Sequence, residues 1–207
     1  MFEGTLRSNL DPFQERTDET LLAALDKCLL RETVQAHADG LLQPVESMGA
    51  NFSLGQQQLV CLARALLNES KLLLLDEATA ALDAETDAMV QRVVRSAFAD
   101  RTVMTIAHRL DTIIDSDRIL VMDAGRVAEF ASPAELLRDE STIFASLCRQ
   151  AGASSFAGLK AAAERHADVL QRIGDAAVSA EEERIQKRSS SIVRAGRRRS
   201  RGLSGEV

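Results

Sequence analysis

The chain has 207 residues, 45% of them hydrophobic and 27% charged, which is enough for one globular domain with a buried core and an appended segment. No apolar stretch approaches the roughly 20 residues that cross a bilayer, and the first residues lack the basic and apolar regions of a signal peptide. The net charge of −6 argues against nucleic acid as the main partner. We therefore expect neither a signal peptide nor a transmembrane segment.

The three cysteines, Cys28, Cys61 and Cys148, are widely spaced, and each lies in an apolar helical pattern. An odd number of cysteines without metal-ligand spacing does not suggest a disulfide framework or a zinc site. The sequence predicts buried, reduced thiols of a cytosolic protein.

Two helices are predicted in the first third of the chain. Apolar residues recur at helical spacing between Asp18 and Leu30, directly after the capping residue Thr17. A second helix should run from Ser53 to about Asn68, because Ser53 and Gln56 have the spacing of a capping box.

A strand, a helix and a strand follow. Leu72 to Leu75 is a short, unbroken apolar run, which is typical of a strand buried on both faces. A helical pattern covers 87–99, and a second buried strand is predicted over 102–107. This order implies a parallel sheet with a right-handed crossover.

The last third begins with a predicted hairpin over 118–130, turning at Gly125, and Ser132-Pro133 opens the next helix as cap and first-turn proline. Ordered structure should close near Gly152. Residues 153–187 have a weak amphipathic helical pattern. The positions of its apolar stripe are Leu159, Ala163, His166, Leu170 and Ile173. Residues 188–207 are rich in Ser and Arg and cannot bury a core.

The most informative segment begins the second helix and reads Asn51-Phe-Ser-Leu-Gly-Gln-Gln-Gln-Leu59. A helix N-terminus has unpaired N–H groups and the positive end of the helix dipole, so it favours an anion. An ordinary capped helix would explain Ser53-Leu-Gly-Gln56 alone. The sequence that follows favours the anion site.

Two acids and a histidine lie where the predicted strands end. Asp76 and Glu77 follow the four leucines, and His108 follows the second strand. Open α/β sheets bind their ligands at this edge, where one acid could hold Mg²⁺ through water and the other could orient or deprotonate the attacking water. Taken alone, each would be an ordinary solvated residue.

Together, these segments resemble the signature, Walker B and switch-histidine motifs of an ABC-type ATPase, in family order and spacing. The resemblance implies an α/β fold of the P-loop NTPase class: a partial ABC nucleotide-binding domain over 1–152, with the helical signature subdomain and the parallel-sheet half but without the Walker A half. It assigns Ser53, Gly55 and Gln56 to the γ-phosphate of ATP held by the opposite domain of a dimer. Asp76 would hold Mg²⁺ through water, Glu77 and His108 would be catalytic, and Asp83 would be the D-loop aspartate.

The subfamily is narrowed by the segment Phe2-Glu-Gly-Thr-Leu-Arg-Ser-Asn-Leu-Asp-Pro-Phe13, which resembles the region after the Q-loop in multidrug-resistance-associated exporters. Leu54 and Glu77 favour the second nucleotide-binding domain of that subfamily. The implied partners are another nucleotide-binding domain and transmembrane domains, at the cytoplasmic face of a membrane.

No Gly-x-x-x-x-Gly-Lys-Ser/Thr loop occurs in the 207 residues. We therefore expect this chain alone neither to bind ATP tightly nor to hydrolyse it, and to expose apolar surface. A non-catalytic fragment that binds another nucleotide-binding domain is the alternative. An ABC ATPase of DNA repair or chromosome structure is disfavoured by the exporter-like segments 8–13 and 116–127.

The segment Arg184 to Arg201 has many basic residues and no acid. It could be a solvated, disordered end. It could also be attracted to an anionic membrane surface, an attraction that phosphorylation of serines such as Ser200 would weaken. Nucleic-acid binding is the poorer alternative, because no aromatic residues are interleaved with the arginines.

Overall fold

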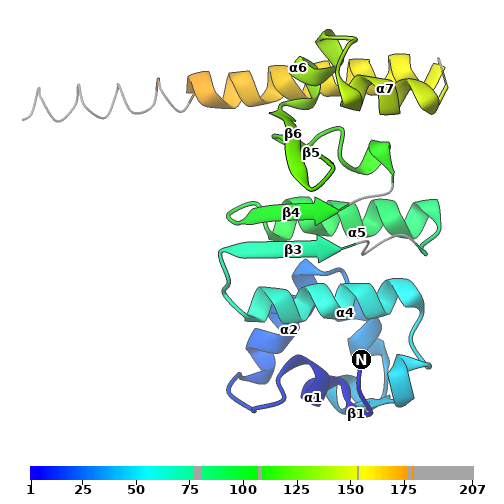
Figure 1. Ribbon diagram of the computed structural model, residues 1–207. Helices are drawn as coiled ribbons and strands as arrows, with labels where there is room; N and C mark the ends of the chain where they lie inside the picture. The colour runs from blue at the N-terminus through cyan, green and yellow to red at the C-terminus, as the bar shows by residue number, and fades with distance from the viewer. Residues whose placement is uncertain (77–80, 107–108, 153, 177–178, 180–207) are drawn as a thin grey trace, which may run out of the picture. The chain divides into compact units, whose positions relative to one another are not determined.

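A computed structural model describes residues 1–76, 81–106, 109–152, 154–176 and 179 (Figure 1). Contacts within the chain group it into two compact units that divide between Thr112 and Ile113. No helix in these described ranges is both long and apolar enough to cross a membrane.

The first unit begins with short elements around one longer helix. The helices are α1 (Leu6–Leu10), α2 (Asp18–Lys27), α3 (Arg31–Ala36) and α4 (Leu54–Leu67), with 3-10 turns at Gly40–Leu42, Ser47–Gly49 and Leu110–Thr112. The short strands β1 (Gly4–Thr5) and β2 (Pro44–Val45) pair antiparallel. The predicted helices α2 and α4 are confirmed, with Thr17 and Ser53 as their caps.

The core of this unit is built on α4, which packs against α1, α2 and the later helix α5 (Ala84–Ala97). Val60 and Ala63 of α4 and Leu21 and Leu25 of α2 are fully buried. Burying an aliphatic side chain contributes about 1.5–3 kcal/mol, so these contacts fix the position of α4.

The predicted strand, helix and strand are confirmed. Strands β3 (Leu72–Asp76) and β4 (Thr102–Ile106) pair in parallel, from Leu72 opposite Thr102 to Asp76 opposite Ile106, and α5 connects them. Figure 1 shows β3 and β4 side by side with α5 alongside. The helix begins three residues earlier than its apolar pattern indicated, because the side chain of Asp83 caps its first turn.

The prediction that this sheet is buried on both faces is wrong for the described chain. Leu73, Leu75 and Val103 pack against the core. The opposite face is exposed, and its four apolar side chains have exposed fractions of 51%, 64%, 51% and 60%: Leu72, Leu74, Met104 and Ile106. The apolar run specified a strand correctly, but a local pattern does not say how many faces are covered.

The second unit contains the predicted hairpin and helices. Strands β5 (Ile119–Asp123) and β6 (Arg126–Ala131) pair antiparallel, with a register shift between Val121 and Met122. Ala124 and Gly125 both have positive φ, 46° and 75°, as expected for a two-residue hairpin turn. Helix α6 (Pro133–Arg138) is capped by Ser132 and precedes α7 (Ile143–Gln150).

A further helix covers residues 154–176. Leu159 and Ala163 are buried, whereas Leu170 and Ile173 are 38% and 61% exposed. The predicted amphipathic stripe therefore packs only in its first half. The basic segment that follows lies outside the described residues.

The cysteines are free thiols. Cys28 and Cys148 are buried as predicted, and burial raises the pKa of Cys28 to about 12. The prediction is wrong for Cys61, which is exposed on α4.

Two arginines from other segments hold the C-terminal end of α4. Arg101 donates to the carbonyls of Ala65 and Leu66 at 3.0 and 3.2 Å, and Arg16 donates to Leu67 at 3.0 Å. The last carbonyls of a helix have no intrahelical partner and lie at its negative end, so cations are favoured there. The Arg101 guanidinium also lies over the ring of the buried Phe98.

Arg101→Ala removes both hydrogen bonds and the ring contact. We expect the free energy of unfolding to fall by about 2 kcal/mol, since hydrogen bonds to charged groups contribute about 1.5–3 kcal/mol. Urea unfolding of the chain measures this change in the free energy of unfolding. Arg92→Ala, an exposed arginine on α5, is the matched control and should change it by no more than about 0.5 kcal/mol. Equal effects of the two substitutions would contradict the role of Arg101.

Candidate functional site

The first turn of α4 contains three of the predicted site residues. The backbone N–H of Ser53 donates to Gln56 Oε1 at 2.9 Å, and the backbone N–H of Gln56 donates to Ser53 Oγ at 3.2 Å. This reciprocal capping box fixes the turn. The N–H groups of Leu54 and Gly55 have no intrahelical partner at such a position.

The loop before α4 is fixed by side-chain amides. Asn51 Nδ2 donates to the carbonyl of Pro44 at 2.8 Å, and Asn51 Oδ1 accepts from Glu46 N–H at 3.0 Å. Gln57 Nε2 donates to the carbonyls of Gly49 and Phe52. Asn51 and Gln57 thus hold the path of the chain into the first turn.

This turn fits an anionic ligand such as a phosphate group of ATP. It begins a 14-residue helix, so the free N–H groups and the positive end of the helix dipole are at the same place. Ser53 and Leu54 are exposed, and the Ser53 hydroxyl and the Gln56 amide still have protons to donate. The donor set is uncharged, so affinity for an anion would depend on a partner or a cation.

Asp76 lies at the C-terminal end of β3, opposite Ile106 of β4, and it is exposed. Its carboxylate is an oxygen ligand of the kind that Mg²⁺ prefers. In the part of the chain that the structure describes, no three His, Cys, Asp or Glu side chains are grouped to hold a metal ion. The predicted catalytic residues Glu77 and His108 lie outside the described residues.

Asp83 forms the N-cap of α5. Its Oδ1 accepts from the N–H groups of Glu85 and Thr86 at 3.1 and 3.0 Å, and its Oδ2 accepts from the Thr86 hydroxyl at 2.7 Å. The hydrogen bonds from the Thr86 backbone and hydroxyl lower the pKa of Asp83, because they favour the ionised carboxylate.

An ion pair that sequence reasoning missed joins α5 to the residue after His108. Arg109 Nη1 lies 3.4 Å from Oδ2 of Asp87, whose side chain is 5% exposed. Arg109 also donates to Asp111 at 3.1 Å, and this bond and the Asp111 charge raise the pKa of Arg109, with a smaller contribution from Asp87. The sequence contained a pattern that could have predicted this ion pair. Asp87 lies on the same helical stripe as Val90 and Val94, and a buried acid on an apolar stripe needs a partner.

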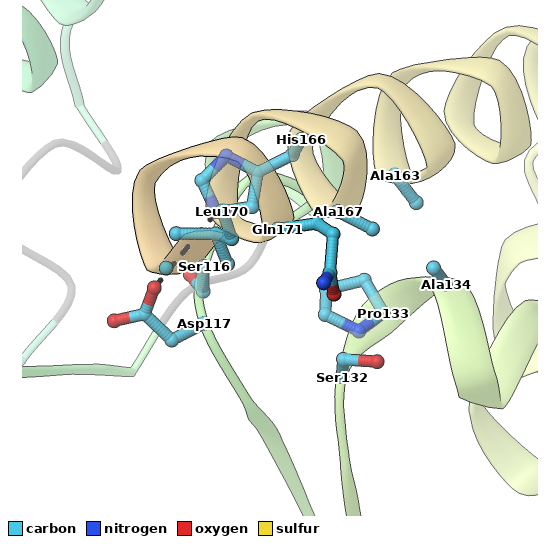
Figure 2. Close-up of a pocket in the computed structure, with 11 residues that line it drawn as sticks. Ser116, Asp117, Ser132, Pro133, Ala134, Ala163, His166, Ala167, Leu170 and Gln171 are labelled. Atoms are coloured by element: carbon cyan, nitrogen blue, oxygen red, sulfur yellow. Dashed lines mark ion pairs between the residues drawn. The ribbon is translucent and has the colours of Figure 1, made fainter. Parts of the chain in front are cut away.

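The second unit has a hollow between the helix over 154–176 and the residues around Asp117 and Ser132 (Figure 2). Small side chains such as Ala163 and Ala167 line most of it. His166 Nε2 lies 3.9 Å from Asp117 Oδ1, an ion pair when the imidazole is protonated. These contacts attach the helix to its own unit.

Comparison with known proteins shows the family to which the chain is similar. The family model described as "ABC transporter" matches residues 6–80. The chain is 53% identical over 160 residues to "Probable multidrug resistance-associated protein lethal(2)03659" of Drosophila melanogaster, covering 77% of this chain and 12% of that protein. It is 56% identical over 153 residues to "Metal resistance protein YCF1" of Saccharomyces cerevisiae, covering 73% and 10%.

The chain belongs to the ABC transporter family. A solved structure, "Structure of a bacterial Atm1-family ABC exporter with ATP bound", is similar with a TM-score of 0.65 and 35% identity, over 74% of this chain and 27% of that one. The predicted fold class and the resemblance to multidrug-resistance-associated proteins are confirmed. The ABC chain spans only 10–12% of the length of these two curated relatives.

The charge of Asp83 should affect the stability of this ABC chain in a pH-dependent way. Because its pKa is lowered in the folded state, its contribution is fully present above the ordinary aspartate pKa of about 4 and is lost as pH falls through the folded value. We expect Asp83→Asn to lower the thermal unfolding midpoint at pH 7, and the difference from the unsubstituted chain to disappear on acidification.

Circular dichroism melts of both chains at a series of pH values measure that difference. Other acids with a lowered pKa, such as Glu135, which accepts hydrogen bonds from Ser132, contribute equally to the stability of both chains. Their contributions cancel in the difference. A difference that does not change with pH would show that the Asp83 charge contributes nothing.

Proposed function

We propose that the chain is part of the second nucleotide-binding domain of an ABC exporter and couples ATP hydrolysis to transport across a membrane. The observation that supports this most strongly is the first turn of α4. Its capping box fixes Ser53 and Gln56, and its first N–H groups have no intrahelical partner. Such a turn can receive an anion without reorganising, which is what electrostatic stabilisation of a charged transition state requires.

In this proposal, the turn acts on ATP held by the opposite nucleotide-binding domain. Ser53 and Gln56 donate to the γ-phosphate from their side chains, and Gly55 donates from its backbone N–H. The turn contributes no positive side chain, so it can recognise the phosphate only after another domain has bound the nucleotide.

The C-terminal edge of β3 and β4 serves a second ATP. Asp76 at the end of β3 holds Mg²⁺ through water, and Glu77 orients or deprotonates the attacking water, while His108 contacts the γ-phosphate. When bound, Mg²⁺ offsets the charge of the phosphates. These roles rest on the family motifs that the residues match. Asp83, the cap of α5, communicates between the two sites.

The partners are a second nucleotide-binding domain and the transmembrane domains of the exporter, with this domain at the cytoplasmic face of the membrane. We further propose that the 207-residue chain is inactive alone. Its sequence has no phosphate loop, so Asp76 and Glu77 would face the phosphates with little positive charge beyond the metal ion.

The test mixes the purified chain with a separately purified first nucleotide-binding domain of a related exporter, whose phosphate loop is intact. We expect association that depends on ATP and Mg²⁺ and is lost with EDTA. Gln56→Glu should weaken it at least tenfold, or about 1.4 kcal/mol. This substitution keeps the capping box, because glutamate accepts the same hydrogen bond, but places a negative charge at the phosphate. Analytical ultracentrifugation gives the dissociation constants.

Gln35→Glu is the matched control: it makes the same charge change at an exposed position of α3 and should leave association unchanged. Association that does not depend on ATP and is unchanged by Gln56→Glu would instead support the alternative, a non-catalytic fragment that only binds another nucleotide-binding domain. Mg²⁺-dependent ATP turnover by the chain alone, abolished by Glu77→Gln, would refute the proposed inactivity.

We also propose that the basic segment from Arg184 to Arg201 is attracted to anionic membranes. Each basic residue near such a surface contributes roughly 1 kcal/mol, and salt screens the attraction. Flotation with liposomes containing phosphatidylserine should recover the chain at low salt but not at high salt. Recovery that is unchanged by deletion of Lys187 to Val207 would exclude the proposal.

A further inference from the structure

Gly55, in the first turn of α4, packs directly against Thr86 of α5. Gly55 is buried, and a Cβ atom added to it would lie 2.3 Å from Thr86 Cγ2. Real Cβ atoms do not approach another carbon so closely. The Thr86 methyl group therefore occupies the space that any side chain at position 55 would need.

The Thr86 side chain is not free to turn away. Its hydroxyl donates to Asp83 Oδ2 at 2.7 Å, while Asp83 Oδ1 accepts from the Thr86 backbone N–H at 3.0 Å. A threonine on a helix has few χ1 rotamers, and rotation that moves the methyl group also moves the hydroxyl on the same carbon. Moving the methyl away from Gly55 thus breaks the bond to Asp83.

We propose that Thr86 is a positioning residue that couples Asp83 to Gly55. One side chain holds the carboxylate through its hydroxyl and sets the packing distance of the α4 first turn through its methyl. A displacement of Asp83 therefore changes the rotamer of Thr86 and the space at Gly55. The consequence for ATP rests on the proposed function: the phosphate-binding turn would respond to the D-loop aspartate of its own chain.

The test is a set of double-mutant cycles on the stability of the full chain. Alanine is favoured over glycine within a helix, so without the contact Gly55→Ala would be neutral or stabilising. With the contact, we expect the unfolding equilibrium constant to rise roughly tenfold, because overpacking a filled site is destabilising. Urea unfolding at pH 7 measures each variant.

Three backgrounds separate coupling from simple crowding. Thr86→Ser removes the methyl group but keeps the hydroxyl, so Gly55→Ala should cost less than about threefold in that background. Asp83→Ala removes the bond that fixes the Thr86 rotamer, so it should also reduce the cost of Gly55→Ala. This effect passes through Thr86 and needs no direct contact between residues 55 and 83. Thr86→Val keeps a methyl group but removes the bond to Asp83, so in that background Asp83→Ala should no longer change the cost of Gly55→Ala.

A Gly55→Ala chain as stable as the parent would overturn the contact. An equal cost of Gly55→Ala with and without Asp83 would overturn the coupling. Both stability measurements are made without nucleotide. They therefore test the contact and the coupling even if the proposed function is wrong. The nucleotide arm repeats the ATP-dependent association with the folded Thr86→Val chain: weaker association is expected, and unchanged association would overturn the consequence for ATP.

Discussion

Helix α4 is held at its C-terminal end by side chains from other segments and at its first turn by its own capping box, and the first unit depends on that restraint. Arg101 and Arg16 bind the carbonyls of its last turn, and the capping box closes its first turn. Between them, the buried residues Val60 and Ala63 join α4 to the core. A helix fixed in this way keeps the direction of its dipole and its free N–H groups constant. An anion site made mostly of backbone needs this restraint, because it has no long side chain that could adjust to the ligand.

The α5 helix connects the other parts of the site to α4. Asp83 and Thr86 lie at its start, Asp87 pairs with Arg109 one turn later, and Arg101 follows its end. These contacts join segments that are distant in sequence through one rigid element. Thr86, Asp87 and Arg101 thus hold in place the segments that carry the family motifs.

The sequence specified the elements whose information is local. The caps of α2 and α4, the leucine run of β3 and the Gly125 hairpin were all predicted from patterns a few residues long, and each is present. The start of α5 was missed, because an apolar pattern begins at the first buried residue and not at the cap. Contacts such as Arg101 with Ala65 join residues far apart in the chain, and no periodicity encodes them. The proposed roles of Glu77 and His108 still rest on motif alone.

The exposed face of β3 and β4 has a consequence for the behaviour of the chain in solution. Leu72, Leu74, Met104 and Ile106 form an apolar row that ends beside the exposed Asp76, and no third strand pairs with this sheet within the described ranges. Apolar strands with open edges template self-association, and apolar association weakens on cooling. The solubility of the isolated chain should therefore be governed by this row and by temperature more than by its net charge of −6.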